Sequence, residues 1–358
     1  MARLRRSNCA GPGIRRIRRG KGFSYADDEG RRIDEPQVLA RIRELMIPPA
    51  WKAVWICPWP TGHIQATGID AAGRKQYLYH PDWRAHRDRE KFDDMVAFAR
   101  DLPDLRAAVD QILSASDELS RERVLAAAIR LLDRGFFRIG SEDYAVTNET
   151  YGLATMRKSH LALEGEDTMV FDYPAKSGIR RVQAVVDPLV IDVISQLKRR
   201  RGGGEELLAF KRGRRWHDIR SSDINAFIKD HTGGHHSAKD FRTWNATLLA
   251  SVRLAASEAA ATSMTSRKRA ISGAVKEVAR YLGNTPAVCR ASYIDSRVID
   301  AYLDGRTIGP ALHAAIEDLE PGTLLIHQGE LEAAVLDLVT RQYDSEHIEK
   351  VAPRLKAA

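Results

Sequence analysis

The chain has 358 residues, of which 44% are hydrophobic and 29% are charged. This balance is typical of a globular protein and too apolar for a disordered one, and the length suits two or three domains. No stretch reaches the 18 or more apolar residues of a transmembrane helix, and the basic N-terminus lacks the apolar segment of a signal peptide, so we expect neither membrane insertion nor export. Three widely spaced cysteines, Cys9, Cys57 and Cys289, form no CxxC pair, which argues against disulfides or structural zinc and favours a reducing cytoplasm.

Positive charge is distributed unevenly along the chain. The net charge is +8, but residues 311–358 carry −5, which leaves +13 for residues 1–310. Residues 1–23 hold eight basic side chains and no acidic one, and further basic clusters occur at Lys198–Arg201 and Lys211–Arg215. A basic body with an acidic tail predicts a polyanionic partner, most simply nucleic acid. A disordered, solvated leader is the alternative for residues 1–13, but it does not explain the later clusters.

The predicted elements change character along the chain. Short apolar runs between turn residues predict a mainly antiparallel β-unit over residues 14–80, with one helix near 36–45. Helical spacing follows over 86–113 and 120–134, and a β-hairpin is expected at 168–186 with its turn at 174–178. Further helices are expected near 187–199, 221–231, 240–257 and 268–282. Another begins at Thr285-Pro286, because threonine is a good N-cap and proline suits the first helical position.

These patterns predict an α+β protein of four segments. Residues 1–13 form a flexible basic leader, 14–88 a small β-rich N-terminal domain, 89–310 a larger, mainly helical domain, and 311–358 an acidic helical tail divided by Pro321-Gly322. We expect the tail to pack on the larger domain.

Several kinds of chemistry lack their sequence motifs. Neither a GxxxxGK[ST] or GxGxxG phosphate loop nor an HExxH metal motif occurs, and the glycine run at 202–204 is typical of a loop. His235 and His236 are adjacent, so one helical or strand face cannot present both to a metal, and we interpret the pair as structural. Acidic clusters with the spacing of a two-metal nuclease are also absent.

A set of polar side chains remains that could act on a phosphate: Arg138, Lys176, Arg242, Asn284 and Tyr293. Taken singly, each has an ordinary structural interpretation. Arg138 could pair with Glu142, Lys176 could be solvated at its hairpin tip, and Tyr293 could be a core aromatic residue.

Taken together, these residues lie in motifs that occur in a known order. The sequence resembles the type IB DNA topoisomerases, specifically the small poxvirus-like enzymes of bacteria, from about Gly13 to Gly305. The N-terminal motifs are Ile47–Trp51 and Gly68–His80. The C-terminal motifs are Phe136–Gly140, Tyr144–Leu153, Ala175–Gly178, Lys239–Trp244 and Leu282–Tyr293.

The resemblance implies a role for each of the five residues. Tyr293 would attack a DNA phosphodiester and form a 3′-phosphotyrosyl ester, whose energy is similar to that of the broken bond, so that resealing needs no ATP. Arg138 and Arg242 would bind the non-bridging oxygens. Lys176 would protonate the departing 5′-oxygen. Asn284 would donate a hydrogen bond to a phosphate oxygen, at a position where many relatives have histidine.

The resemblance also implies a DNA-contacting surface outside the catalytic residues. The expected contacts are Arg74, Lys75, Gln76, Tyr77 and Tyr79 in the N-terminal domain and Tyr144 in the catalytic domain. Tyr77 and Tyr79 alternate on a strand and would point the same way, although a buried sheet face is the alternative for this pair. The implied partner is double-stranded DNA, bound by a monomer in the cytoplasm at the nucleoid, without cofactor or metal.

Two other functions fit parts of this pattern. A tyrosine recombinase uses the same Arg/Lys/Arg/Tyr chemistry, but it usually has histidine three residues before the second arginine, where this chain has Lys239, and its N-terminal domain is helical. A non-catalytic DNA-binding protein is the second alternative. It is disfavoured because each expected catalytic position holds a competent side chain.

Overall fold

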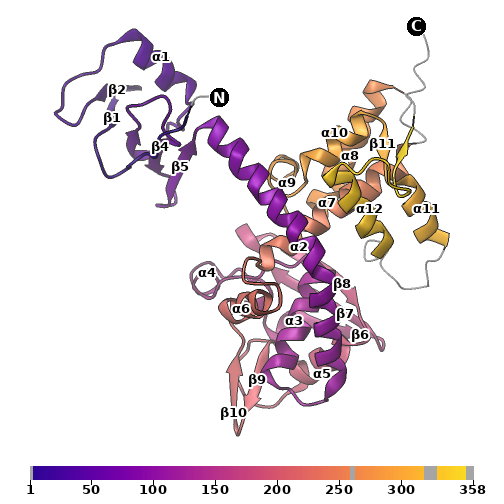
Figure 1. Cartoon of the computed structure of the whole chain (residues 1–358). Coiled ribbons are helices and arrows are strands. Elements are labelled where there is room, and N and C mark those ends of the chain that lie inside the picture. Colours follow the sequence, from indigo (N-terminus) through magenta and orange to yellow (C-terminus); the bar gives the residue numbers. More distant parts are fainter. Residues whose placement is uncertain (1–2, 259–262, 318–328, 352–358) are drawn as a thin grey trace. The chain divides into compact units, whose positions relative to one another are not determined.

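A computed structural model describes residues 3–258, 263–317 and 329–351, and the chain divides into two compact units, Met1–Lys91 and Phe92–Ala358 (Figure 1). The division falls three residues after the expected boundary at 88. The first unit is a β-sheet with one helix and the second is mainly helical, so the fold is α+β as predicted.

The first unit is a five-stranded antiparallel sheet of order β2-β1-β3-β4-β5. Its elements are β1 (Ile14–Arg19), β2 (Gly22–Ala26), α1 (Pro36–Glu44), β3 (Lys52–Ile56), β4 (Ile64–Ile69) and β5 (Lys75–Tyr79). A small core of Ile14, Ile42, Val54, Ile56 and Ala66 lies between the sheet and α1. Strand β5 is at an edge of the sheet, where one side of its backbone is unpaired within the sheet.

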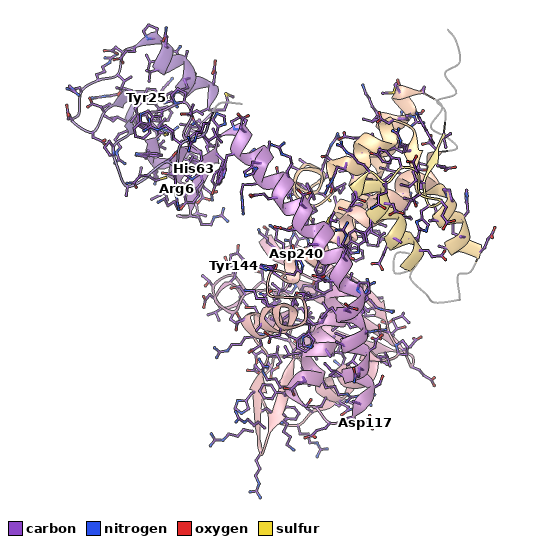
Figure 2. The ribbon with its side chains drawn as sticks, viewed as in Figure 1. Arg6, Tyr25, His63, Asp117, Tyr144 and Asp240 are labelled. Carbon is purple, nitrogen blue, oxygen red and sulfur yellow. The ribbon has the colours of Figure 1, made fainter. Side chains whose placement is uncertain are left out.

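The basic leader is attached to this sheet, although we expected it to be flexible. Arg5 forms a parallel bridge with Gly62, and the Ser7 backbone N–H donates to Nδ1 of His63 over 2.8 Å. The Arg5 guanidinium lies 4.2 Å above the Trp59 ring. Arg6 and His63 lie together at the surface of the unit (Figure 2). The charge of this segment is therefore held in place by backbone bonds and cation–π contact.

The second unit contains the remaining helices and strands. The helices are α2 (Pro81–Ala115, which begins in the first unit), α3 (Arg121–Gly135), α4 (Glu142–Asn148), α5 (Val190–Arg199), α6 (Ser221–His231), α7 (Ala238–Ala256), α8 (Met264–Leu282), α9 (Pro286–Ser292), α10 (Ser296–Leu303), α11 (Gly309–Glu317) and α12 (Gly329–Thr340), with 3-10 turns at Leu153–Thr155, Lys158–His160 and Lys176–Gly178. The strands are β6 (Leu161–Glu164), β7 (Thr168–Pro174), β8 (Arg180–Val186), β9 (Ala209–Arg212), β10 (Arg215–Asp218), β11 (Arg306–Thr307) and β12 (Glu349–Lys350).

The predicted hairpin at 168–186 is present, with Thr168 opposite Val186 and Pro174 opposite Arg180. It belongs to a three-stranded sheet of order β6-β7-β8. A second hairpin, β9–β10, was missed because its residues include the Lys211–Arg215 cluster, which the sequence analysis interpreted only as charge. The expected helices lie within a few residues of the observed ones. The sequence analysis missed α4 and also α10, which follows the helix that begins at Thr285-Pro286.

Helix α7 runs through the centre of the second unit. It contacts α3, α6, α8, α10, α11 and α12, and most of its residues are buried. Buried polar side chains, among them Arg242, Asn245 and Thr247, interrupt its apolar surface. Such groups are stable in a core only when they are hydrogen-bonded, so α7 has specific polar contacts to its neighbours.

The segment expected as an acidic tail contains two helices that pack on this unit. Helix α11 starts at Gly309 and contacts α7, while α12 contacts α7, α10 and α11. The residues Leu331, Ala334, Val335, Leu338 and Val339 bury the apolar side of α12. The expected break at Pro321-Gly322 lies outside the described residues. None of the helices in the described ranges has the length and apolar character that crossing a membrane would require.

Candidate active site

Arg242 is a buried cation on α7 that binds two other segments of the chain. Its side chain is 4% exposed; Nη1 donates to the carbonyl of Phe136 over 2.6 Å and Nη2 to that of Leu282 over 2.8 Å. Its Nε is buried and finds no hydrogen-bond partner among the described residues. Burial, assisted by the charge of Arg138, lowers the pKa of Arg242 to about 10, so the group is still a cation at neutral pH.

Arg138 follows a strained helix end. Helix α3 ends at Gly135, and Phe136 has φ 53°, a left-handed conformation that costs a non-glycine residue about 1–2 kcal/mol. Burial of the ring and the bond from Arg242 to the Phe136 carbonyl hold this conformation. Arg138 is then half-buried; its Nη2 donates to the Gly283 carbonyl over 3.1 Å and to the side-chain oxygen of Asn284.

A close backbone approach fixes the residues after Arg138. The Leu153 N–H donates to the Arg138 carbonyl over 2.8 Å, and Ala154 N–H to Ile139 over 2.7 Å. A Cβ at Gly152 would lie 2.4 Å from the Gly140 nitrogen, a distance that real side chains do not adopt. Glycine is therefore required at 152 for this contact.

Asn284 lies in the loop between α8 and α9, in contact with Arg138. Its oxygen accepts the bond from Arg138, while its Nδ2 is buried and has no partner within the described part of the chain. The side chain therefore retains a hydrogen-bond donor that the protein itself does not use. That donor is what the resemblance requires at this position.

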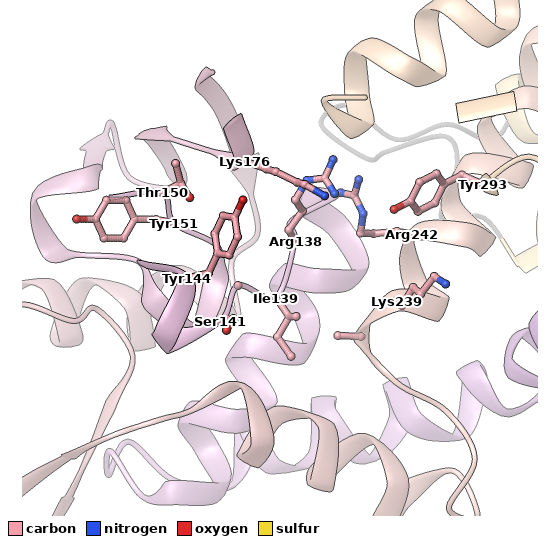
Figure 3. A pocket seen from close by; sticks show the side chains of 12 residues that line it. Arg138, Ile139, Ser141, Tyr144, Thr150, Tyr151, Lys176, Lys239, Arg242 and Tyr293 are labelled. Carbon is pink, nitrogen blue, oxygen red and sulfur yellow. The ribbon is translucent and has the colours of Figure 1, made fainter. Parts of the chain in front are cut away.

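Tyr293 comes directly after α9, whose predicted start is confirmed: the Thr285 side chain caps the helix and Pro286 is its first residue. The Arg242 guanidinium lies 5.3 Å from the Tyr293 ring centre, and Figure 3 shows the phenol oxygen pointing toward that arginine. Burial raises the pKa of the Tyr293 phenol, but the charges of Arg242 and Arg138 outweigh this effect and bring it below its usual value.

Lys176 is at the tip of the β7–β8 hairpin, in a turn closed by the bond from Ala175 N–H to the Ile179 carbonyl, 2.9 Å long. The next residue, Ser177, has φ 67°, which reverses the chain so tightly that Lys176 is exposed at the tip. Its side chain extends toward Arg138 and Arg242 (Figure 3).

These side chains surround one cleft within the second unit. Its lining is Arg138, Ile139, Gly140, Ser141, Tyr144, Thr150, Tyr151, Lys176, Ala238, Lys239, Arg242 and Tyr293 (Figure 3). Four of the five predicted catalytic residues line it, and Asn284 is hydrogen-bonded to one of them. The structure thus brings together five side chains that are up to 155 positions apart in the sequence.

Lys239 and Arg181 are cations near the cleft that were not predicted as site residues. Lys239, one helical turn before Arg242, lines the cleft, and its charge also lowers the pKa of Tyr293. Arg181 on β8 lines an adjoining cleft that shares Arg138, Lys176 and Arg242, and it donates to the backbone carbonyl of Tyr281 at the end of α8. The i, i+3 spacing from Arg242 could have identified Lys239, whereas only the fold reveals Arg181.

The pairing of Arg138 with Glu142, the ordinary interpretation of Arg138, does not occur. Glu142 instead accepts from the backbone N–H and hydroxyl of Ser221 over 2.7 and 2.8 Å. His236 is buried and its Nε2 lies 3.2 Å from a carboxylate oxygen of Asp101, in line with a structural role. Among the described residues, no group of three or more His, Cys, Asp or Glu side chains could hold a metal ion.

The expected DNA contacts are divided between the two units. Tyr77 and Tyr79 on β5 are 41% and 40% exposed and stack with ring centres 6.1 Å apart, which excludes the buried-face alternative. Lys75 lies on the same side of the strand, with its ammonium 5.6 Å from the Tyr77 ring. Gln76 lies on the opposite side, and its amide donates to Asp70 over 2.8 Å.

The remaining two candidates are also at the surface. Arg74 is paired with Asp70 at 2.9 Å but stays mostly exposed. Tyr144 on α4 is 40% exposed and lines the cleft of the second unit (Figures 2 and 3). Tyr144 therefore adjoins the five catalytic candidates, while the other five expected contacts belong to the first unit.

Comparison with known proteins identifies relatives of both units. The family model described as the catalytic core of eukaryotic DNA topoisomerase I matches residues 80–304, and that of the N-terminal domain of bacterial DNA topoisomerase IB matches residues 22–70. DNA topoisomerase 1B of Acanthamoeba polyphaga mimivirus is 28% identical over 305 residues, which cover 81% of this chain and 87% of the viral protein. DNA topoisomerase 1 of Schizosaccharomyces pombe is 28% identical over 165 residues, 46% of this chain and 19% of the yeast protein.

The geometry predicts how the Tyr293 phenol titrates. Replacing Arg242 by glutamine removes the nearest positive charge, so the pKa of Tyr293 should rise, and a higher pH should be needed to form the phenolate. The phenolate absorbance of the folded protein, minus that of its Tyr293→Phe variant, reports this titration. Arg215→Gln, which removes one exposed charge on β10, should leave it unchanged. Identical midpoints for the parent protein and Arg242→Gln would contradict the interpretation.

Proposed function

Because the chain belongs to the DNA topoisomerase I family, as an enzyme of type IB, we propose that it relaxes supercoiled DNA through a transient break made by Tyr293. The phenol of Tyr293 loses its proton to water, and its oxygen then attacks a backbone phosphorus and becomes bonded to it as a 3′-phosphotyrosyl ester. The bond from phosphorus to the 5′-oxygen breaks, and that oxygen leaves as a hydroxyl group. After the DNA has rotated, the 5′-hydroxyl attacks the ester, reforms the strand and releases Tyr293.

The pKa of Tyr293 supports its role as nucleophile. An unperturbed tyrosine has a pKa of ~10, so only about one in a thousand is ionised at pH 7. The charges of Arg242 and Arg138 lower this pKa despite burial. The same charges stabilise the negative charge that develops on the phosphorane oxygens in the transition state.

The observation that carries the proposal is the set of unused donors on Arg242 and Asn284. Only two of the five N–H groups of Arg242 are used by backbone carbonyls, and its Nε and the Nδ2 of Asn284 are buried without partners in the described residues. Buried donors without partners cost roughly 1–3 kcal/mol each. A phosphate oxygen that reached these donors would satisfy them, which supports the binding of an anion at this site.

Lys176 completes the reaction as general acid. The leaving 5′-alkoxide is far more basic than a phenolate and needs a proton as the bond breaks. The lysine is exposed at a hairpin tip and extends toward the arginines, so it can approach DNA bound in the cleft (Figure 3).

Exposed side chains on both units provide the binding contacts to double-stranded DNA. Tyr77 and Tyr79 offer aromatic edges and hydroxyl groups, while Lys75 and Arg74 offer phosphate contacts that fix position without reading sequence. We propose that one protein monomer binds each cleavage site. The tyrosine recombinase alternative is not supported, since the matched N-terminal domain is that of bacterial topoisomerase IB.

The purified protein should relax supercoiled plasmid with excess EDTA and without ATP. Tyr293→Phe should abolish relaxation and retain DNA binding, because it removes only the nucleophilic oxygen. Agarose gels and a binding assay measure both properties, with Tyr343→Phe as the matched control. Unchanged relaxation by Tyr293→Phe would remove this residue from the mechanism, and retained binding without any relaxation by the parent protein would favour the non-catalytic alternative.

Changing the leaving group of the DNA substrate distinguishes a role of Lys176 in proton transfer from a role in DNA binding alone. Lys176→Ala should slow cleavage by about 10²–10⁴-fold, the usual contribution of a general acid. Replacing the bridging 5′-oxygen by sulfur should restore most of the rate, because a thiolate leaves without protonation. Cleavage rates on matched oxygen and sulfur duplexes measure this. An equal defect on both substrates would show that Lys176 is not the acid.

A further inference from the structure

Within the described residues of the acidic tail, Glu332 on α12 is the one buried carboxylate. It is 9% exposed, whereas Glu330 on the same helix is exposed. Helix α12 lies after residue 304, where the match to the catalytic-core family ends. We propose that Glu332 is a positioning residue that holds the two arginine-bearing segments of the active site, an inference that rests on the proposed function.

Glu332 makes three hydrogen bonds to groups of the catalytic unit. Its Oε1 accepts from the indole Nε1 of Trp244 over 2.9 Å and from Nη2 of Arg106 over 3.0 Å, and its Oε2 accepts from Nη1 of Arg106 over 2.6 Å. Trp244 is fully buried on α7, two residues after Arg242. The tail carboxylate is thus bonded directly to the helix that carries Arg242.

The same carboxylate is connected to the end of α3 through Arg106 on α2. Nε of Arg106 donates to one carboxylate oxygen of Asp133 over 2.8 Å, and Nη2 donates to the other over 3.0 Å. Burial disfavours the charge of Arg106, but the carboxylates of Asp133 and Glu332 raise its pKa above the usual value. Arg106 is therefore a fixed cation between two carboxylates, one from α3 and one from the tail.

The end of α3 and α7 are in turn bonded to each other at the site. The Asp133 carbonyl accepts from Nδ2 of Asn245 over 2.6 Å, and the Phe136 carbonyl accepts from Arg242. Arg138 follows two residues after Phe136. A shift of Glu332 would therefore change how α7 and the α3 end meet, and with them the spacing of Arg138 and Arg242.

Glu332 touches none of the proposed reacting groups, so its effect must be indirect. Truncating it leaves the Trp244 N–H without an acceptor and Arg106 with only one carboxylate, and removing one partner from a buried ionic network is strongly destabilising. If the network relaxes by moving α7, Arg242 moves relative to Tyr293. Misplacement by about 1 Å can cost ~10²-fold in rate.

Three variants test this inference, with one control. Glu332→Ala removes all three bonds, and Glu332→Gln keeps an acceptor for Trp244 but loses the charge. Trp244→Phe removes the indole donor together with part of the buried ring. Glu330→Ala removes the same charge from the exposed face of α12. Each is examined as full-length protein, with circular dichroism to establish that it is folded at the assay temperature.

The measurement is the rate of covalent complex formation on a short duplex, at saturating enzyme and over a range of pH. We expect Glu332→Ala to cleave on the order of 10–100-fold more slowly, with Glu332→Gln and Trp244→Phe intermediate and Glu330→Ala unchanged. DNA affinity should be retained. The pH at which cleavage reaches its plateau should rise, because Arg242 no longer lowers the pKa of Tyr293 to the same extent.

The outcomes separate this inference from the proposed function. Folded variants with the parent rate and pH profile, even if they melt at a lower temperature, would overturn the positioning role and leave Glu332 as a structural residue only. If Glu332→Ala does not fold, the rates of Glu332→Gln and Trp244→Phe decide in the same way. A parent protein that forms no covalent complex would overturn the proposed function instead.

Discussion

A buried guanidinium, that of Arg242, holds the candidate active site together, although it pairs with no carboxylate of the described residues. Removing a charge from water costs several kcal/mol, and the Arg242 side chain offsets that cost with two carbonyl oxygens, those of Phe136 and Leu282. One carbonyl lies just before Arg138 and the other just before Asn284. Forming these bonds therefore fixes both neighbours, and the remaining positive charge acts on Tyr293 and on any anion in the cleft.

Helix α7 carries this guanidinium and is itself held on several sides. Thr247, farther along the helix, donates to the Tyr293 carbonyl over 3.3 Å and accepts from the Asp295 N–H over 3.2 Å, so the backbone at Tyr293 and just after it is tied to α7. Trp244 bonds to the tail and Asn245 to α3. These hydrogen bonds between buried polar groups favour one arrangement of the core, which explains how segments far apart in the sequence meet at the site.

Local sequence patterns predicted the helices and turns that carry the site residues. They predicted few of the long-range contacts that join these elements. Thr285-Pro286 marked the start of α9, and the turn at 174–178 placed Lys176 at a hairpin tip, because capping and turn preferences act over a few residues. The contact between Arg106 and Glu332 spans 226 positions and has no local signal. The attachment of the leader to the sheet, the outward face of Tyr77 and the opposite orientation of Gln76 likewise depend on which strand lies beside which.

The attachment point of cleaved DNA tests the central claim most directly. A covalent complex formed on a duplex oligonucleotide, denatured, digested and analysed by mass spectrometry, identifies the residue that bears the nucleotide. This account predicts a single adduct on Tyr293, linked to a 3′-phosphate, with a free 5′-hydroxyl on the other fragment. An adduct on Tyr144, Tyr151 or Ser141, which line the same cleft, or a 5′-linked phosphate would contradict it.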